Sequence, residues 1–130
     1  MLSISTGWKW LLFVVVALFL SGCSSDTITQ QQRESAKAIL EKGLNAWKSG
    51  EDAKKWTDEK ASPRFLDDNW SKGSKLVSYE IVRIKGNVDA VPIAYVKLTI
   101  QPAKGGDQVI MNAEYGINLE KQIVSRDPMT

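Results

Sequence analysis

The chain has 130 residues, with 17 basic side chains against 15 acidic ones, no histidine and a single cysteine. This near balance of charge argues against a nucleic-acid partner, which requires a strongly basic face. Without histidine or a second cysteine, the chain lacks the usual zinc ligand sets, histidine-activated nucleophiles and an intrachain disulfide. We therefore expect no catalytic residue, no bound metal and no cofactor.

The first 22 residues have the pattern of an export signal. Ten apolar residues run from Leu11 to Leu20, Lys9 precedes them, and no acidic side chain occurs before Asp26. A ten-residue helix is about 15 Å long, or about half of a hydrocarbon core, so this segment is short for a permanent membrane helix. The order of positive, apolar and small residues is typical of a secretory signal peptide.

The only cysteine follows directly after this signal. Leu20-Ser21-Gly22-Cys23 resembles the lipobox of bacterial lipoproteins, in which a branched apolar residue and two small residues precede a cysteine. Small side chains let the backbone enter the peptidase cleft, and the thiol is the nucleophile that captures a diacylglycerol group. The resemblance implies cleavage between Gly22 and Cys23, a lipid on the Cys23 sulfur and an acyl chain on the new amine. The alternative is a core cysteine behind an ordinary signal or a short membrane helix.

The residues after the cysteine bear on which membrane holds the protein. Two or three acyl chains anchor a protein firmly, since each buried methylene contributes about 0.8 kcal/mol. Ser24 and Ser25 stand where an aspartate often signals retention in the inner membrane of two-membrane bacteria. By this resemblance we expect a lipoprotein of the outer membrane that faces the periplasm. The alternative location is the outer face of the cytoplasmic membrane.

The chain then divides into a signal peptide (1–22), a lipidated cysteine with a short linker (23–28) and a single domain (29–130). Removal of Lys9 with the signal lowers the 17 basic side chains to 16, against 15 acidic ones. A chain of about 100 residues is enough for one domain with one core. Five linker residues span at most about 18 Å, so we expect the domain to lie close to the bilayer.

Helix signals begin at Thr29. Thr29 and Gln32 fit a capping box, and apolar residues recur at spacings of three and four, which predicts a helix over Gln30–Lys48. A shorter helix is expected over Asp52–Trp56, and another helical turn at Pro63. The segment 67–74 is rich in turn-forming residues and is expected to be a loop.

From residue 75 the apolar period changes to two, which predicts strands at 75–85, 93–101, 108–120 and 122–126. The predicted fold is α+β, with a long N-terminal amphipathic helix and one or two short helices packed on a curved four-stranded antiparallel sheet. One face of this sheet packs on the helices and the other meets water or a partner. The second face is expected to carry Tyr95, Lys97, Thr99, Asn112 and Glu114.

This order of elements resembles the cone-shaped fold of nuclear transport factor 2, a superfamily that includes ketosteroid isomerase and many small bacterial lipoproteins. The likeness covers residues 29–128, and the ending Gln122–Pro128 is similar to the last strand of such lipoproteins. A cystatin-like sheet wrapped on one helix is the competing fold. The resemblance implies a homodimer through the open sheet face or, alternatively, a small-molecule site or an isomerase- or lyase-like enzyme in the cone's cavity.

The residues themselves favour a lipid-anchored, non-catalytic binding module over an enzyme. The candidate pocket for the enzymatic or ligand-binding alternative combines Trp56, Trp70 and Glu80. The apolar alternation in the strand that holds Glu80 is broken, so either a bulge switches its faces or Glu80 points into a cavity. Asp67–Asn69 resembles the start of a calcium loop, but the glycine and the bidentate glutamate of such a loop are missing, which favours turn chemistry.

Overall fold

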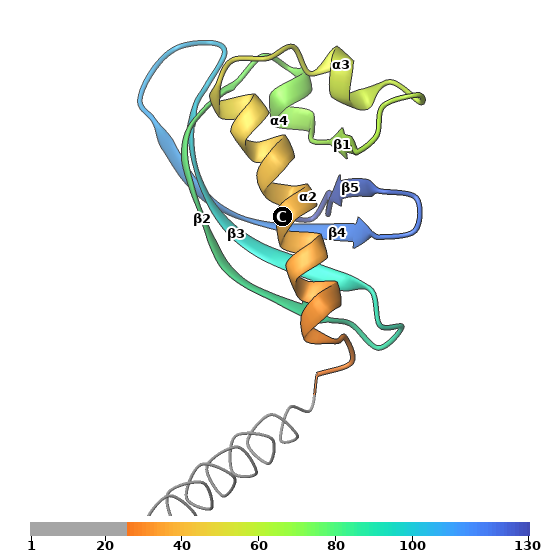
Figure 1. The fold of residues 1–130 in the computed structure, drawn as a ribbon. Helices are drawn as coiled ribbons and strands as arrows, with labels where there is room; N and C mark the ends of the chain where they lie inside the picture. Colours follow the sequence, from red (N-terminus) through yellow and green to blue (C-terminus); the bar gives the residue numbers. More distant parts are fainter. Residues whose placement is uncertain (1–25) are drawn as a thin grey trace, which may run out of the picture.

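The computed structural model describes residues 26–130 (Figure 1). The predicted signal peptide, the cleavage site at Gly22–Cys23 and the lipid attachment at Cys23 lie outside the described residues. Within the described range, no helix has both the length and the apolar character needed to cross a bilayer.

The first helix, α2, spans Gln30–Lys48. Its start is fixed by a reciprocal pair of hydrogen bonds: the Gln32 N–H donates to Thr29 Oγ1 at 3.1 Å, and the Thr29 N–H donates to Gln32 Oε1 at 2.8 Å. Both bonds satisfy backbone donors that the first helical turn leaves unpaired. One face of the helix is buried, formed by Ala36, Leu40, Gly43, Leu44, Ala46 and Trp47.

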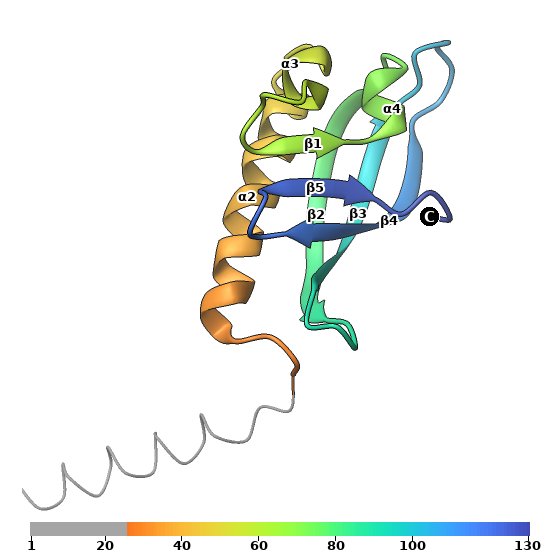
Figure 2. The ribbon, with the colours of Figure 1, turned by 90° about the vertical axis from the view of Figure 1, so that its right-hand side faces the viewer.

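The α+β class is confirmed, but the four-stranded antiparallel sheet is corrected to a mixed sheet of five strands (Figures 1 and 2). The strand order is β1-β5-β4-β3-β2, in which β1 pairs with β5 in parallel and all other pairs are antiparallel. The strands are β1 (Arg64–Leu66), β2 (Lys75–Gly86), β3 (Pro92–Gln101), β4 (Val109–Asn118) and β5 (Ile123–Arg126).

The additional strand, β1, forms where the sequence indicated a helical turn at Pro63. Its central residue, Phe65, is fully buried and stands opposite Val124 of β5. The ring packs so closely on α2 that a Cβ on Gly43 would come within 2.1 Å of it. Burial of Phe65 thus places β1 at the sheet edge, although three residues are too few to show strand alternation.

Two short helices lie near the C-terminal end of α2 (Figure 1). Helix α3 covers Lys54–Thr57, later in the chain than the expected Asp52–Trp56. Helix α4 covers Asp68–Ser71 inside the segment that was expected to be a loop. Asp67 makes this turn possible, because its Oδ1 accepts the Asn69 N–H at 2.8 Å and caps the helix.

Two bulges in β2 account for its broken alternation. Its register against β3 shifts between Leu76 and Ser78, and again between Ile81 and Arg83. Between the bulges Glu80 stands opposite Lys97 and is exposed. The bulge interpretation of this strand is therefore correct, and Glu80 does not point into a cavity.

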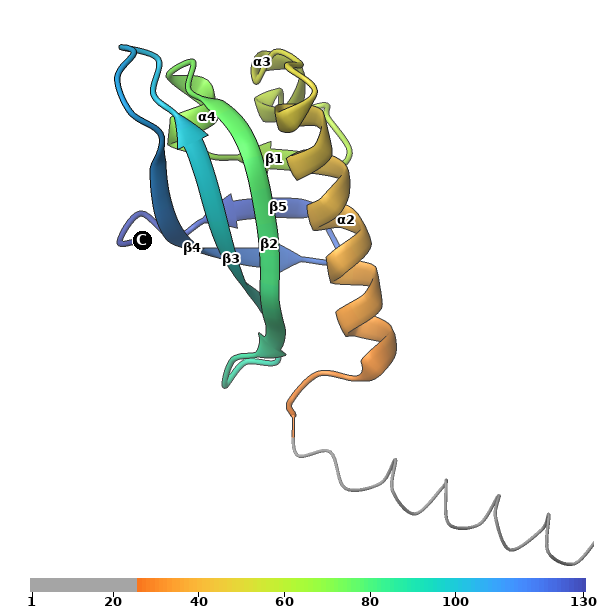
Figure 3. The ribbon, with the colours of Figure 1, turned by 90° about the vertical axis from the view of Figure 1, so that its left-hand side faces the viewer.

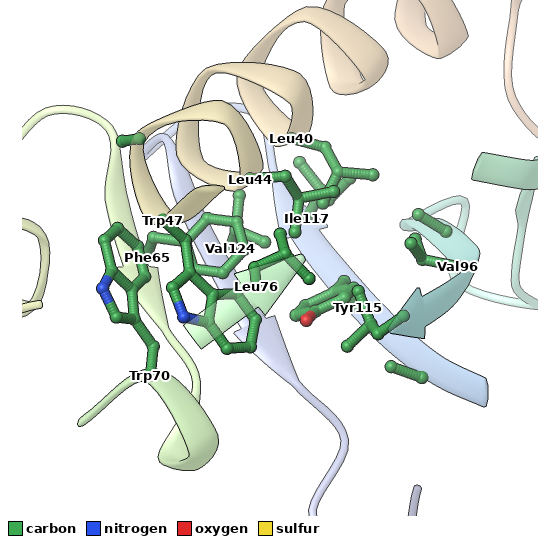
Figure 4. Close-up of a cluster of buried hydrophobic side chains, with 14 of the residues drawn as sticks. Leu40, Leu44, Trp47, Phe65, Trp70, Leu76, Val96, Tyr115, Ile117 and Val124 are labelled. Carbon is green, nitrogen blue, oxygen red and sulfur yellow. The ribbon is translucent and has the colours of Figure 1, made fainter. Parts of the chain in front are cut away.

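The sheet curves around α2, which covers one face of β2, β3 and β4 (Figures 1 and 3). Among residues 26–130 no helix covers the opposite face of these three strands (Figure 3). The core between helix and sheet contains Tyr115, Phe65, Leu40, Leu44, Leu98, Ile100, Ile117, Val96 and Val124 as its largest fully buried side chains (Figure 4).

The domain also begins earlier than expected. Ile28 is only 4% exposed and belongs to the core, and the Gly86 N–H donates to Asp26 Oδ1 at 2.9 Å. The part of the predicted linker from Asp26 to Ile28 is thus docked on the end of β2. Only Ser24 and Ser25 separate this docked segment from Cys23 in the sequence.

Candidate functional site

The structure brings together two of the three predicted pocket residues. Trp56 and Trp70 lie with ring centroids 5.9 Å apart and planes tilted by 38°. Trp70 also stacks on Trp47 at 5.8 Å with an interplanar angle of 13°, and meets Phe65 edge-on at 5.7 Å. Glu80 is not part of this cluster, since it lies exposed on β2 opposite Lys97. The rings of Trp47, Phe65 and Trp70 pack against one another (Figure 4).

The polar atoms of the two buried indoles are bonded to loop backbone. Trp47 Nε1 donates to the Ser74 carbonyl at 2.8 Å, and Trp70 Nε1 donates to the Glu51 carbonyl at 3.0 Å. Buried indoles usually find such a partner, and here each one ties a loop to the core. A surface cleft of about 470 Å³ lies beside them, lined by Trp47, Gly50, Glu51, Asp52, Ala53, Lys54, Thr57, Trp70, Ser71, Gly73, Ser74 and Lys75.

A buried polar network links α4 to β4 and β5. Asp67 is 3% exposed, and its Oδ2 accepts the Tyr115 hydroxyl at 2.5 Å. Arg126 Nη1 lies 3.4 Å from Asp67 Oδ1. Burial, and then the negative charge of Asp67, raise the pKa of Tyr115, so its hydroxyl stays protonated and donates.

The acid and the phenol of this network already bind each other, which gives them a structural role. Asp67 joins the start of α4 to β4 through Tyr115 and to β5 through Arg126. Arg126 Nη2 further donates to the Thr130 carbonyl at 3.0 Å. The sequence did not indicate this network, because its members lie 48 and 59 residues apart from Asp67. The only local signal was the aspartate that caps α4.

One face of the sheet carries all five residues that the sequence predicted there, namely Tyr95, Lys97, Thr99, Asn112 and Glu114. Cross-strand pairs join Tyr95 to Glu114, Lys97 to Asn112 and Thr99 to Ile110, and the two members of each pair project from the same side. We call this the open face, and define it by the outward residues Ser78, Glu80, Val82 and Arg83 of β2, Tyr95, Lys97 and Thr99 of β3, and Ile110, Asn112 and Glu114 of β4.

The open face combines apolar, aromatic and charged groups. Val82 is 60% exposed and Ile110 is 63% exposed, both high values for apolar side chains on strands. The Arg83 guanidinium lies 4.6 Å from the centre of the Tyr95 ring, within the range of a cation–π contact. A hollow of about 330 Å³ lies here, lined by Val82, Arg83, Tyr95, Val96, Asn112, Ala113, Glu114 and Thr130.

Metal-binding groups are not assembled in the part of the chain that the structure describes. Residues 26–130 contain no cluster of three or more histidine, cysteine, aspartate or glutamate side chains placed to hold an ion. In particular, Asp67 of the considered calcium loop is engaged with Tyr115 and Arg126.

Comparison of the chain with protein-family models, with curated proteins and with solved structures found no match.

Proposed function

We propose that this protein is a lipid-anchored, non-catalytic binding module of the bacterial envelope that recognises a partner protein through its open face. The anchor is the lipid on Cys23 that the lipobox resemblance implies, and the location that this resemblance favours is the outer membrane, facing the periplasm. The observation that carries the binding role is the exposure of Val82 and Ile110 beside Tyr95 and Arg83. Tyrosine and arginine are enriched at protein interfaces, where charged groups form the rim.

The packing of the aromatic rings supports this function over the alternative of a ligand cavity or an enzyme. Trp47, Phe65, Trp70 and Tyr115 occupy the space between α2 and the sheet, with centroid separations between 5.4 and 5.8 Å among neighbouring rings. A ligand inside this core would have to displace buried aromatic side chains, each of which buries about 150–250 Å². The cleft of about 470 Å³ beside Trp47 and Trp70 lies at the surface, outside the packed core.

A second copy of the chain is the partner that the charges of the open face fit best. The face carries Glu80 and Glu114 together with Arg83 and Lys97, so both signs of charge are present. In a twofold dimer the same patch meets itself, and an acidic group of one copy can face a basic group of the other. Val82 and Ile110 would then become buried near the centre of the contact.

Site-specific photo-crosslinking in the native membrane tests this proposal. A photoreactive amino acid replaces Ile110 on the open face in one strain, and Lys37, which is exposed on α2, in another. Both positions are exposed, so neither replacement disturbs the core. The proposal expects a discrete product of twice the chain mass from position 110 and none from position 37.

The other outcomes are equally informative. A discrete product with one different protein at position 110 keeps the binding module but replaces the second copy as its partner. Identical products from both positions, or no product from position 110, would contradict the proposal.

A further inference from the structure

The first described residues are bound to the end of the β2–β3 hairpin. Asp26 Oδ1 accepts the Gly86 N–H at 2.9 Å, and the Thr27 hydroxyl donates to the Asn87 carbonyl at 2.9 Å. Ile28 then enters the core and is 4% exposed. Three consecutive residues are thus fixed on the hairpin before α2 begins.

An arginine in the first turn of α2 reinforces this contact. Arg33 forms an ion pair with Asp26, and its Nε donates to the Ile84 carbonyl at 2.8 Å. Gly86 is packed so closely here that a Cβ on it would come within 2.0 Å of Thr27 Oγ1. The N-terminal segment and the hairpin therefore behave as one unit.

The distance from this unit to the anchor is short. Only Ser24 and Ser25 lie between Cys23 and Asp26 in the sequence. Three steps between consecutive Cα atoms cover at most about 11 Å. This step rests on the proposed function: where Cys23 carries the lipid, the lipidated residue lies within that distance of Asp26, and the membrane surface is therefore close to Asp26.

The loop of the hairpin lies at the same end of the molecule. The β2–β3 connection is beside the start of α2, whereas the β3–β4 connection is at the opposite end (Figures 1 and 3). Any surface that reaches Asp26 through so short a tether is thus adjacent to the loop formed by Asn87–Val91.

This loop presents an apolar side chain on a fixed turn. Val88 is 95% exposed, the highest value among the exposed large apolar residues of the described chain. Asn87 orders the turn, because its Oδ1 accepts the N–H groups of Asp89 at 2.9 Å and of Val91 at 3.0 Å. Covering such an exposed apolar group with a hydrocarbon surface is favourable, because it removes apolar surface from water.

We propose that the β2–β3 loop rests on the lipid bilayer, with Val88 embedded at its surface as a second contact beside the lipid on Cys23. Two contacts restrict the orientation of the domain more than the lipid on Cys23 alone would. Strands β2 and β3 run from this loop toward the opposite end of the molecule (Figure 3). In this orientation the open face stands upright from the membrane, where a second anchored copy can approach it from the side.

Spin labelling of the full-length, lipidated protein tests the inference. Nitroxide labels are attached to Val88→Cys, and in separate samples to Lys104→Cys in the β3–β4 loop and to Ile110→Cys on the open face. Position 104 controls for location, and position 110 controls for the tendency of an exposed apolar residue to carry its label into lipid. The proteins are reconstituted in vesicles of phosphatidylethanolamine and phosphatidylglycerol. Collision rates with oxygen, which concentrates in lipid, and with a water-soluble nickel complex are then measured.

The expected result is a higher ratio of oxygen to nickel collisions at position 88 than at positions 104 and 110. The mass of the N-terminal peptide is measured on the same samples, so that failure of the anchor is recognised separately. If Cys23 carries lipid but position 88 has the ratio of position 104, the inference is overturned and the anchor stands. If Cys23 carries no lipid, both the anchor and the inference fall.

Discussion

The two ends of this small domain are held together by different forces. At the end formed by α3, β1 and α4, the rings of Trp47, Phe65 and Trp70 stack and meet edge-on in the core. At the other end, Asp26 and Arg33 hold the chain to the β2–β3 hairpin through hydrogen bonds and one ion pair.

This difference separates the end that contributes most of the stability from the end that holds the N-terminal segment on the hairpin. A buried aromatic residue is worth several kcal/mol, whereas a typical hydrogen bond contributes about 0.5–1.5 kcal/mol. The aromatic end thus carries much of the stability. The polar end adds less stability but holds Asp26, Thr27 and Ile28 on the β2–β3 hairpin.

The largest effect is expected at the aromatic end, from Trp70→Ala. Trp70 is 5% exposed and contacts three other rings, so its removal leaves a cavity and should cost about 3–5 kcal/mol in urea unfolding. Trp56→Ala is the control, because Trp56 is only half-buried and should cost clearly less. Equal losses from the two variants would show that Trp70 is not the centre of the cluster.

A smaller loss is expected from Tyr115→Phe, which removes the hydroxyl that donates to Asp67. Loss of a hydrogen bond to a charged group should cost about 1.5–3 kcal/mol at neutral pH. The stability of the variant should also depend on pH differently from that of the native protein. The pKa of Tyr115 is raised by burial, so its folded form keeps the proton, and the stability it provides is present below about pH 10 and declines as the pH rises further.

Urea unfolding of both proteins between pH 7 and pH 11 measures this pH dependence. The native protein should lose stability more steeply above pH 10 than the phenylalanine variant does. Parallel curves over the whole range would mean that the Tyr115 hydroxyl is not buried against Asp67.

Gly86→Ala tests the docking of the N-terminal segment at the polar end. The added Cβ would meet Thr27 Oγ1 at 2.0 Å and Ile28 Cγ2 at 2.7 Å, so the segment must move, at a cost of about 1–3 kcal/mol. Gly116→Ala is the matched control, since the nearest atom to its Cβ would be 3.9 Å away. Hydrogen exchange at the Ile28 amide should accelerate in the first variant alone; unchanged exchange would contradict the docking.

Asp26→Asn should give the smallest effect, and one that depends on acid pH. The Gly86 N–H that donates to this carboxylate, together with the Ile28 N–H and Arg33, holds the pKa of Asp26 below 3.8. The stability from Asp26 is therefore present above pH 3.8 and is lost as the pH falls further. Unfolding curves of the native protein and the variant should differ at neutral pH and converge in acid. Asp89→Asn in the same hairpin should leave the neutral value unchanged.

The parts of the fold that were predictable have local causes. The capping box at Thr29 and Gln32 marks the start of α2, and the period of two indicates strands β2, β3, β4 and β5, but not the parallel pairing of β5 with β1. The sequence did not indicate strand β1. This strand pairs with β5, and the paired residues Phe65 and Val124 lie far apart in the sequence. Three residues cannot show a period, and only burial of the Phe65 ring against Gly43 reveals the strand.

The residues of the candidate site were likewise predictable only where their placement has a local cause. Alternation along β3 and β4 was enough to place Tyr95 and Glu114 together on the open face. The broken alternation in β2 left two alternatives open, a bulge or a Glu80 that points into a cavity, and the pairing of β2 with β3 decides for the bulges. The bond between Asp67 and Tyr115 depends on tertiary packing and has no sequence signature of its own.

In the proposed function a lipid on Cys23 holds this domain at a membrane, and the mass of the N-terminal peptide tests for that lipid directly. The native protein, extracted from membranes with detergent, should begin at Cys23 and carry the mass of a diacylglycerol group, with an acyl chain on the amine. Cys23→Ser should lack this mass and remain as an uncleaved precursor, because the serine hydroxyl cannot replace the thiol in lipid transfer. A native protein that keeps Met1 as its first residue, or that has an unmodified Cys23 thiol, would contradict the account.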